Sequence, residues 1–252
     1  MMERSIFEYE NDYILQTKEK IGDIPFLKFK PKDQNGILPS IIYYHGWASS
    51  KEHKIFESQI ISSFGYQVIV PDALYHGERN LIDYDDPFSF NKYAWEIVGN
   101  TIIESKSFID KIIKEHDADP DRICVMGSSM GSFSAGGLFV SNPKLKCLIA
   151  FNGGFSWNEF LEKRLKLYDE DYIKEFNPIC NLDKLNNRAI LMLHGKEDTS
   201  VPIECQRNFY NAAMSFYIDN PEKLKLIEFS GINHIISASM LQNAITFIKM
   251  FL

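Results

Sequence analysis

Residues Arg122–Gly137 read RICVMGSSMGSFSAGG, a short apolar run followed by a turn of small residues. The run Arg122–Met126 predicts a buried strand, and Ser129–Val140 predicts a helix. Between them, residues 127–131 (GSSMG) have the pattern G-x-S-x-G. A serine on a sharp strand-to-helix turn has a strained backbone, and the residues two before and two after it must lack side chains. The segment therefore predicts that Ser129 is a nucleophile at a sheet edge, although a glycine-rich turn whose serine only caps the helix would have the same pattern.

Outward from this turn, short apolar runs alternate with longer segments of helical periodicity. This alternation is typical of βαβ units, so we expect an α/β fold with a mostly parallel, doubly wound sheet and helices on both faces. An alternating hairpin at Tyr13–Lys20 and Ile24–Lys30 precedes these units. The expected strands are Ser40–Tyr44, Gln67–Val70, Lys146–Phe151, Arg188–Leu193 and Leu224–Phe229, and the expected helices are Lys51–Phe64, Lys92–Lys114, Ile203–Tyr217 and His234–Leu252.

The length of 252 residues fits one domain, residues 1–252, because α/β folds of about this size often form a single unit. The segment 155–187 departs from the alternation, since it is rich in Glu, Lys and aromatic residues and has no strand pattern. We expect this segment to be a small helical cap inserted between two strands.

The charge of the chain argues against nucleic acid as a partner. Lys and Arg number 27 and Asp and Glu number 34, for a net charge of −7, whereas a phosphate-binding surface needs excess positive charge. No stretch has the length of apolar residues that a membrane helix needs, and the N-terminal residues lack the apolar region of a signal peptide. We therefore expect a cytoplasmic protein that binds neither nucleic acid nor membrane; the composition leaves its oligomeric state open.

Backbone donors for an oxyanion are expected at two strand ends. His45-Gly46-Trp47 follows the strand Ser40–Tyr44, and Met130 follows the serine. An anionic tetrahedral intermediate needs two converging N–H groups, and a loop that begins His-Gly after an early strand often supplies one of them. We therefore expect Trp47 and Met130 to donate their backbone N–H groups, and the His45 side chain to be hydrogen-bonded internally.

An acid and a base follow the last two strands. Asp198 lies in the loop after Arg188–Leu193, and His234 lies in the loop after Leu224–Phe229. A serine nucleophile needs a histidine base, and that base needs a carboxylate to fix its tautomer. Glu197 competes with Asp198 for this role, and Asp198 is the better candidate. The chain order Ser129, Asp198, His234 is that of α/β-hydrolases.

The chain resembles the α/β-hydrolase superfamily over about residues 20–252, and within it the dienelactone-hydrolase-like and prolyl-oligopeptidase-type esterases. The motifs that carry the resemblance are YYHGW (43–47), PDALYHGER (71–79), GSSMG (127–131), LHGKEDTSVP (193–202) and GINH (231–234). The resemblance implies Ser129 as nucleophile, Asp198 as acid and His234 as base. Two positions depart from it: Trp47 stands where many members have glycine, and dienelactone hydrolases have cysteine where this chain has Ser129, so their lactone chemistry is not expected.

His76 and Arg79 follow the strand Gln67–Val70 and could bind a substrate carboxylate or carbonyl, or they could form a salt-bridged structural turn. His45, His76, His194 and His234 should all lie near the same sheet edge. They lack the spacing of a metal-binding histidine pair, so we expect no catalytic metal and no cofactor.

Together these features predict a serine hydrolase that cleaves carboxylic esters, with a small-molecule ester of a short acid as its substrate. Two alternatives remain: a peptidase or amidase that uses the same three residues, and a non-hydrolytic ligand-binding protein on this fold.

Overall fold

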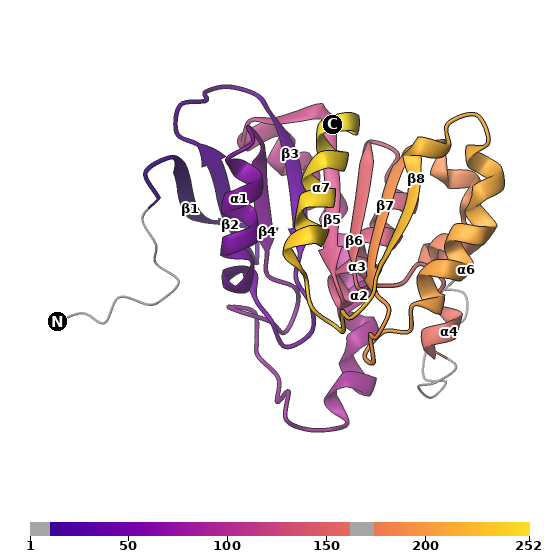
Figure 1. The fold of residues 1–252 in the computed structure, drawn as a ribbon. Helices are drawn as coiled ribbons and strands as arrows, with labels where there is room; N and C mark the ends of the chain where they lie inside the picture. Colours follow the sequence, from indigo (N-terminus) through magenta and orange to yellow (C-terminus); the bar gives the residue numbers. More distant parts are fainter. Residues whose placement is uncertain (1–10, 162–173) are drawn as a thin grey trace.

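The computed structural model describes residues 11–161 and 174–252 (Figure 1). Within these residues, eight strands form one sheet in the order β1-β2-β4-β3-β5-β6-β7-β8. Strands β1 (Ile14–Ile21) and β2 (Ile24–Pro31) form the expected hairpin, and β2 is antiparallel to β4 (Gln67–Pro71). The remaining pairs are parallel and join β4 to β3 (Leu38–Tyr44), β5 (Ala118–Ser128), β6 (Cys147–Phe151), β7 (Ala189–Gly195) and β8 (Leu224–Phe229).

Helices cover both faces of the sheet, which confirms the expected α/β class. Helices α1 (Ile55–Ser62) and α7 (Ala238–Phe251) pack on one face, and α2 (Ser89–Glu115), α3 (Met130–Ser141) and α6 (Glu204–Ala213) pack on the other. The central strands contain continuous apolar runs, such as Ile123–Met126 in β5, because alternate side chains enter the two cores. Val125 of β5 faces the core of α2 and α3, whereas its neighbours Cys124 and Met126 face the core of α1 and α7.

Four expected helices differ from the observed ones by more than one residue, and one of them, expected at Lys92–Lys114, begins three residues earlier as α2. The segment Lys51–Phe64 starts as a 3-10 helix, Lys51–Lys54, before α1, and Ile203–Tyr217 divides into α6 and a 3-10 helix, Met214–Tyr217. The last helix starts at Ala238 and not at His234, because the Ser237 side chain caps it by accepting the Met240 N–H at 3.2 Å. His234 therefore lies on a loop.

The segment 155–187 lies between β6 and β7 in the chain. Its described parts hold a short helix, α4 (Asn158–Leu161), and two 3-10 helices, Pro178–Cys180 and Leu182–Leu185. The rest of the expected cap, residues 162–173, lies outside the described residues. None of the described helices is long and apolar enough to span a membrane.

The loops that follow parallel strands all lie at the same edge of the sheet. The loops after β5, β7 and β8 meet at the lower edge in Figure 1, beside the start of α3. This edge therefore collects residues that are far apart in the sequence.

The turn from β5 into α3 depends on two glycines. Ser129 at its centre has φ 52° and ψ −122°, a conformation that costs free energy for any residue with a side chain. A Cβ on Gly127 would come within 2.2 Å of the Gly131 carbonyl oxygen. A Cβ on Gly131 would come within 2.2 Å of the Tyr44 oxygen and 2.5 Å of the His45 oxygen. The turn can therefore close against the end of β3 only because both positions lack side chains.

We expect Gly131→Ala to destabilise the protein by roughly 2–3 kcal/mol, because the new methyl group overlaps rigid backbone atoms and not a movable side chain. Urea unfolding followed by circular dichroism measures the loss. Ser134→Ala, at a buried position of the same helix, is the control and should cost about 1 kcal/mol or less. Equal stability of the two variants would contradict this account of the turn.

Candidate active site

The structure brings Ser129, His234 and Asp198 into one hydrogen-bonded chain. The Ser129 Oγ lies 2.9 Å from His234 Nε2, and His234 Nδ1 lies 2.7 Å from Asp198 Oδ2. These side chains come from the turns after β5, β8 and β7. A serine hydroxyl, an imidazole and a carboxylate in this order can pass the serine proton to the ring while the carboxylate holds the ring in place.

Asp198 is held as an anion. Its side chain is fully buried, and its Oδ1 accepts the backbone N–H groups of Ser200 and Val201 at 2.8 and 2.9 Å. Burial raises its pKa, but hydrogen bonds from His194, His234 and the Val201 backbone outweigh burial and hold the pKa of Asp198 well below its usual range. The competing acid, Glu197, is exposed to solvent. The geometry therefore favours Asp198 over Glu197 as the partner of His234.

Two asparagines that the sequence patterns did not single out position the loops of the acid and the base. The Asn233 Oδ1 accepts the backbone N–H of Thr199 at 3.1 Å and that of His234 at 2.8 Å. Asn152, directly after β6, donates from Nδ2 to the Ile235 carbonyl at 2.7 Å.

The Oδ1 of Asn152 accepts the Gly195 N–H at 3.0 Å, so its side chain joins the ends of β6 and β7 to the loop of the base. Its position directly after the expected strand Lys146–Phe151 is the one signal in the sequence that could have singled it out, and in the structure its backbone there is left-handed, with φ 47°.

The two expected oxyanion donors, Trp47 and Met130, lie close to Ser129. Met130 is the first residue of α3, where a backbone N–H has no partner within the helix. Trp47 and Met130 line the same cavity as Ser129. Gly46 lies against the serine, since a Cβ on Gly46 would be 3.2 Å from Ser129 Cβ.

The His45 side chain is bonded internally, in line with the expectation. Its Nδ1 donates to the Gly46 carbonyl at 2.9 Å, and its Nε2 accepts the Ala73 N–H at 3.1 Å. Burial, with a smaller contribution from nearby His76, lowers the pKa of His45 to about 3. The ring is therefore neutral near pH 7, and it fixes the backbone on both sides of it.

An aromatic cavity of about 290 Å³ opens beside Ser129. Trp47 forms one wall and packs edge-on against Phe90, with the ring centroids 5.0 Å apart. Phe160 of α4 closes the cavity from the cap side and packs on Phe133 at 5.1 Å. The lining residues are Trp47, Phe90, Ala94, Trp95, Val98, Ser129, Met130, Phe133, Phe160, Ser200, Val201 and His234. The cavity thus suits an uncharged, apolar group of limited size.

His76 and Arg79 make contacts typical of a salt-bridged structural turn, which is one of the two roles that the sequence allowed. Both guanidinium NH groups of Arg79 bind Glu104 of α2, at 2.7 and 2.9 Å, and one also donates to the Asp72 carbonyl. His76 is buried, with its Nδ1 2.8 Å from the Leu74 carbonyl, and its ring packs on Trp47. Neither residue lines the cavity.

The described residues contain no cluster of three or more His, Cys, Asp or Glu side chains arranged to hold a metal ion. The His45 and His76 rings lie 5.1 Å apart, but the nitrogens of His45 are used by the backbone. The described site thus offers Ser129, His234 and Asp198 as its reactive groups.

We expect His45 to make folding sensitive to acid. The unfolded ring titrates near 6.5, and the folded ring titrates near 3, so between these values the unfolded state binds more protons. The free energy of unfolding should therefore fall as the pH drops from about 6.5 toward 3. Between pH 6.5 and 4.5 this one group should account for a loss of about 2 kcal/mol.

Urea unfolding at the two pH values, on the wild type and on His45→Asn, isolates this contribution from that of other groups. The variant should lose about 2 kcal/mol less than the wild type. Identical pH dependence in the two proteins would show that the His45 ring is not buried in its neutral form.

Known proteins resemble this chain both in sequence and in fold. The model of the prolyl oligopeptidase family matches residues 96–251, which include Ser129, Asp198 and His234. Esterase YjfP of Escherichia coli is 28% identical over 255 residues, covering 94% of this chain and 99% of the relative. YitV of Bacillus subtilis, also named as an esterase, is 25% identical over 254 residues, covering 93% and 98%.

Among solved structures, TT1662 from Thermus thermophilus superposes with a TM-score of 0.79 at 18% identity, covering 94% of this chain and 97% of that one. Together with the eight-stranded, mostly parallel sheet and the family match, this likeness identifies the fold as that of an α/β-hydrolase. Since the family model matches more than half of the sequence, the chain belongs to the prolyl oligopeptidase family.

Proposed function

We propose that the protein hydrolyses carboxylic esters of short acids through an acyl-enzyme on Ser129. Its family and its two esterase-named relatives make it a serine hydrolase. The observation that carries the proposal is the hydrogen-bonded chain from the Ser129 hydroxyl through His234 to Asp198. Its substrate is a small-molecule ester.

In the first step, the Ser129 Oγ attacks the ester carbonyl carbon while its proton passes to His234 Nε2, which lies 2.9 Å away. The carbonyl oxygen becomes an oxyanion, which the backbone N–H groups of Trp47 and Met130 stabilise. The carbon–oxygen bond to the alcohol then breaks, and His234 returns its proton to the leaving alkoxide. The products are a free alcohol and an acyl group on Ser129.

Water completes the cycle by the same route. His234 takes a proton from a water molecule, the hydroxide attacks the acyl carbon, and the oxyanion forms again at the same two N–H groups. The intermediate collapses when Ser129 regains its proton from His234. A carboxylic acid leaves, and the buried Asp198 carboxylate stabilises the imidazolium ion that forms in each half of the reaction.

The cavity beside Ser129 supports a preference for short acyl groups. Its walls include five large aromatic side chains, and Trp47 and Phe160 both pack on Phe90 within it. A methylene that fits such a space gains about 0.8 kcal/mol from burial, and one that does not fit forces strain on packed rings.

Amides are the second candidate substrates, because the matched family is named for a peptidase. Parallel assays of p-nitrophenyl butyrate and butyryl p-nitroanilide separate the two. The ester proposal requires a higher kcat/KM for the ester even after the intrinsic reactivity of each substrate is taken into account.

We expect Ser129→Ala to fold normally and to lose nearly all esterase activity, with kcat lower by roughly 10⁴–10⁶-fold, because no other group can form the acyl-enzyme. A fluorophosphonate should add to the wild type at Ser129 and leave the variant unlabelled, which intact mass spectrometry measures. Ser134→Ala, a buried serine of the same helix, is the control and should retain both properties.

Retention of a tenth of wild-type turnover by Ser129→Ala would contradict the assignment of the nucleophile. A wild type that neither turns over esters nor takes up the fluorophosphonate would favour the non-hydrolytic binding protein.

We also expect kcat/KM for p-nitrophenyl esters to be highest from acetyl to butyryl and to fall by octanoyl. Trp47→Ala should move the optimum to longer chains and keep activity, because the oxyanion donor is the backbone N–H and not the indole. A series of esters of increasing chain length measures both profiles. A wild-type optimum at decanoyl, or an unchanged profile in the variant, would rule out this description of the cavity.

A further inference from the structure

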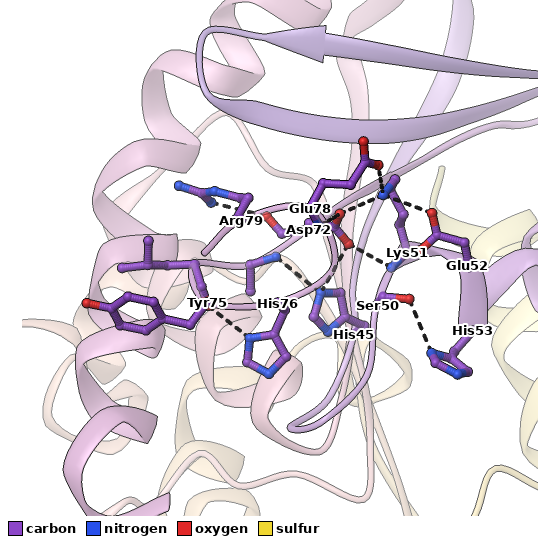
Figure 2. Close-up of polar contacts among 12 residues, drawn as sticks. His45, Ser50, Lys51, Glu52, His53, Asp72, Tyr75, His76, Glu78 and Arg79 are labelled. Carbon is purple, nitrogen blue, oxygen red and sulfur yellow. Dashed lines mark hydrogen bonds and ion pairs between the residues drawn. The ribbon is translucent and has the colours of Figure 1, made fainter. Parts of the chain in front are cut away.

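The loop from His45 to Lys51 carries the Trp47 N–H, and both of its ends are fixed by one neighbouring segment, residues 72–79 (Figure 2). The loop contains a strained residue, since Ala48 has φ 51°. A left-handed conformation at a residue with a side chain persists only where the surroundings enforce it. The contacts at the two ends of the loop are therefore candidates for holding it.

At the first end, His45 sets the orientation of one peptide group. Its Nδ1 donates to the Gly46 carbonyl oxygen at 2.9 Å, and its Nε2 is held by the Ala73 N–H at 3.1 Å. The peptide bond between Gly46 and Trp47 is trans, so the Gly46 oxygen and the Trp47 N–H point in opposite directions. A hydrogen bond that holds the oxygen on the His45 side therefore directs the N–H away from His45.

At the second end, Lys51 is a fully buried cation. Its Nζ lies 2.6 Å from Asp72 Oδ2 and 2.9 Å from Glu52 Oε1, and it also binds Glu78. Burial lowers the pKa of a lysine, but here the hydrogen bonds to these carboxylates outweigh it and raise the pKa of Lys51 above its usual range. The ammonium group therefore remains charged inside the protein.

Asp72 is itself fixed, so it can act as an anchor. Its Oδ1 accepts the Lys51 backbone N–H at 3.0 Å, and its Oδ2 accepts the Glu78 N–H at 3.1 Å. Gly77 packs directly on the carboxylate, since a Cβ there would lie 2.2 Å from Asp72 Oδ2. The next residue, Ala73, supplies the N–H that holds His45. Residues 72–79 therefore form hydrogen bonds to both ends of the His45–Lys51 loop.

We propose that His45 and the buried Lys51–Asp72 pair are positioning residues for the oxyanion site, holding the loop so that the Trp47 N–H faces Ser129. The inference rests on the proposed function, because the Trp47 N–H matters only if an oxyanion forms there. None of the three side chains touches the reacting atoms.

Substituting His45 with asparagine or glutamine tests its two hydrogen bonds separately, because each amide side chain can replace only one of the two ring nitrogens. The side-chain nitrogen of asparagine occupies about the place of Nδ1, so His45→Asn keeps a donor for the Gly46 oxygen. The longer glutamine of His45→Gln reaches the Ala73 N–H but offers no donor at the Nδ1 position. Asp72→Asn keeps the shape of the side chain and removes the charge that pairs with Lys51.

With p-nitrophenyl butyrate, His45→Gln and Asp72→Asn should lower kcat by about 10–100-fold, with KM within about threefold of the wild type. Binding of a trifluoromethyl ketone, which adds to Ser129 as a tetrahedral oxyanion, should weaken in parallel with kcat. His45→Asn should retain kcat within about fivefold. Lys28→Met is the control, since it removes the 2.6 Å pair with Glu19 on the β1–β2 hairpin and should leave kcat unchanged.

Circular dichroism and assays well below each melting temperature ensure that only folded protein is compared. The proposal is overturned if folded His45→Gln and Asp72→Asn keep kcat within threefold of the wild type, or if ketone binding is unaffected. Equal losses in His45→Asn and His45→Gln would also overturn it, since the Gly46 bond would then not set the orientation. A wild type that does not hydrolyse the ester or react with a fluorophosphonate would refute the proposed function itself.

Discussion

The close approach of the β5–α3 turn to the end of β3 is the contact on which the site depends. Gly131 lies against the carbonyl oxygens of Tyr44 and His45, closer than any side chain would allow. This contact places the start of α3 beside the loop that leaves β3. Ser129 is then half-buried between that loop and the loops after β7 and β8, and its strained backbone is compensated by the packing around it.

Charge in this site is buried only where it is fully hydrogen-bonded. Asp198 and Asp72 are both inaccessible to water, and each accepts two backbone N–H groups as well as bonds from side chains. An unpaired carboxylate in either place would take up a proton. The backbone loops that donate these bonds are therefore as important to the site as the carboxylates themselves.

The sequence was sufficient to predict the order of strands and helices, because apolar runs mark buried parallel strands clearly. It also singled out Ser129, Asp198 and His234 by their motifs and their places after strand ends, and the structure brings these three side chains into one hydrogen-bonded chain. The start of α7 was predicted too early, because the periodic pattern extends back through Ile235 and Ile236 and only the Ser237 cap fixes the boundary.

The contacts that support the site could not be predicted in this way. Lys51 looks like an ordinary surface lysine at the start of a helix, and its partner Asp72 is 21 residues away. Asn152 joins Gly195 and Ile235, which are 43 and 83 residues distant. Such pairs are set by the way loops cross in space, and no local pattern encodes them.

The hydrogen bonds that support the site form two separate sets, and Asn152 is the centre of the first set. Its side chain binds the end of β7 and the loop after β8, so the acid and the base are held as one body. The oxyanion loop is held by a second set of hydrogen bonds, to Asp72 at the end of β4. The two sets share no residue, so a substitution in one removes no hydrogen bond of the other, and Ser129 is the point at which both act.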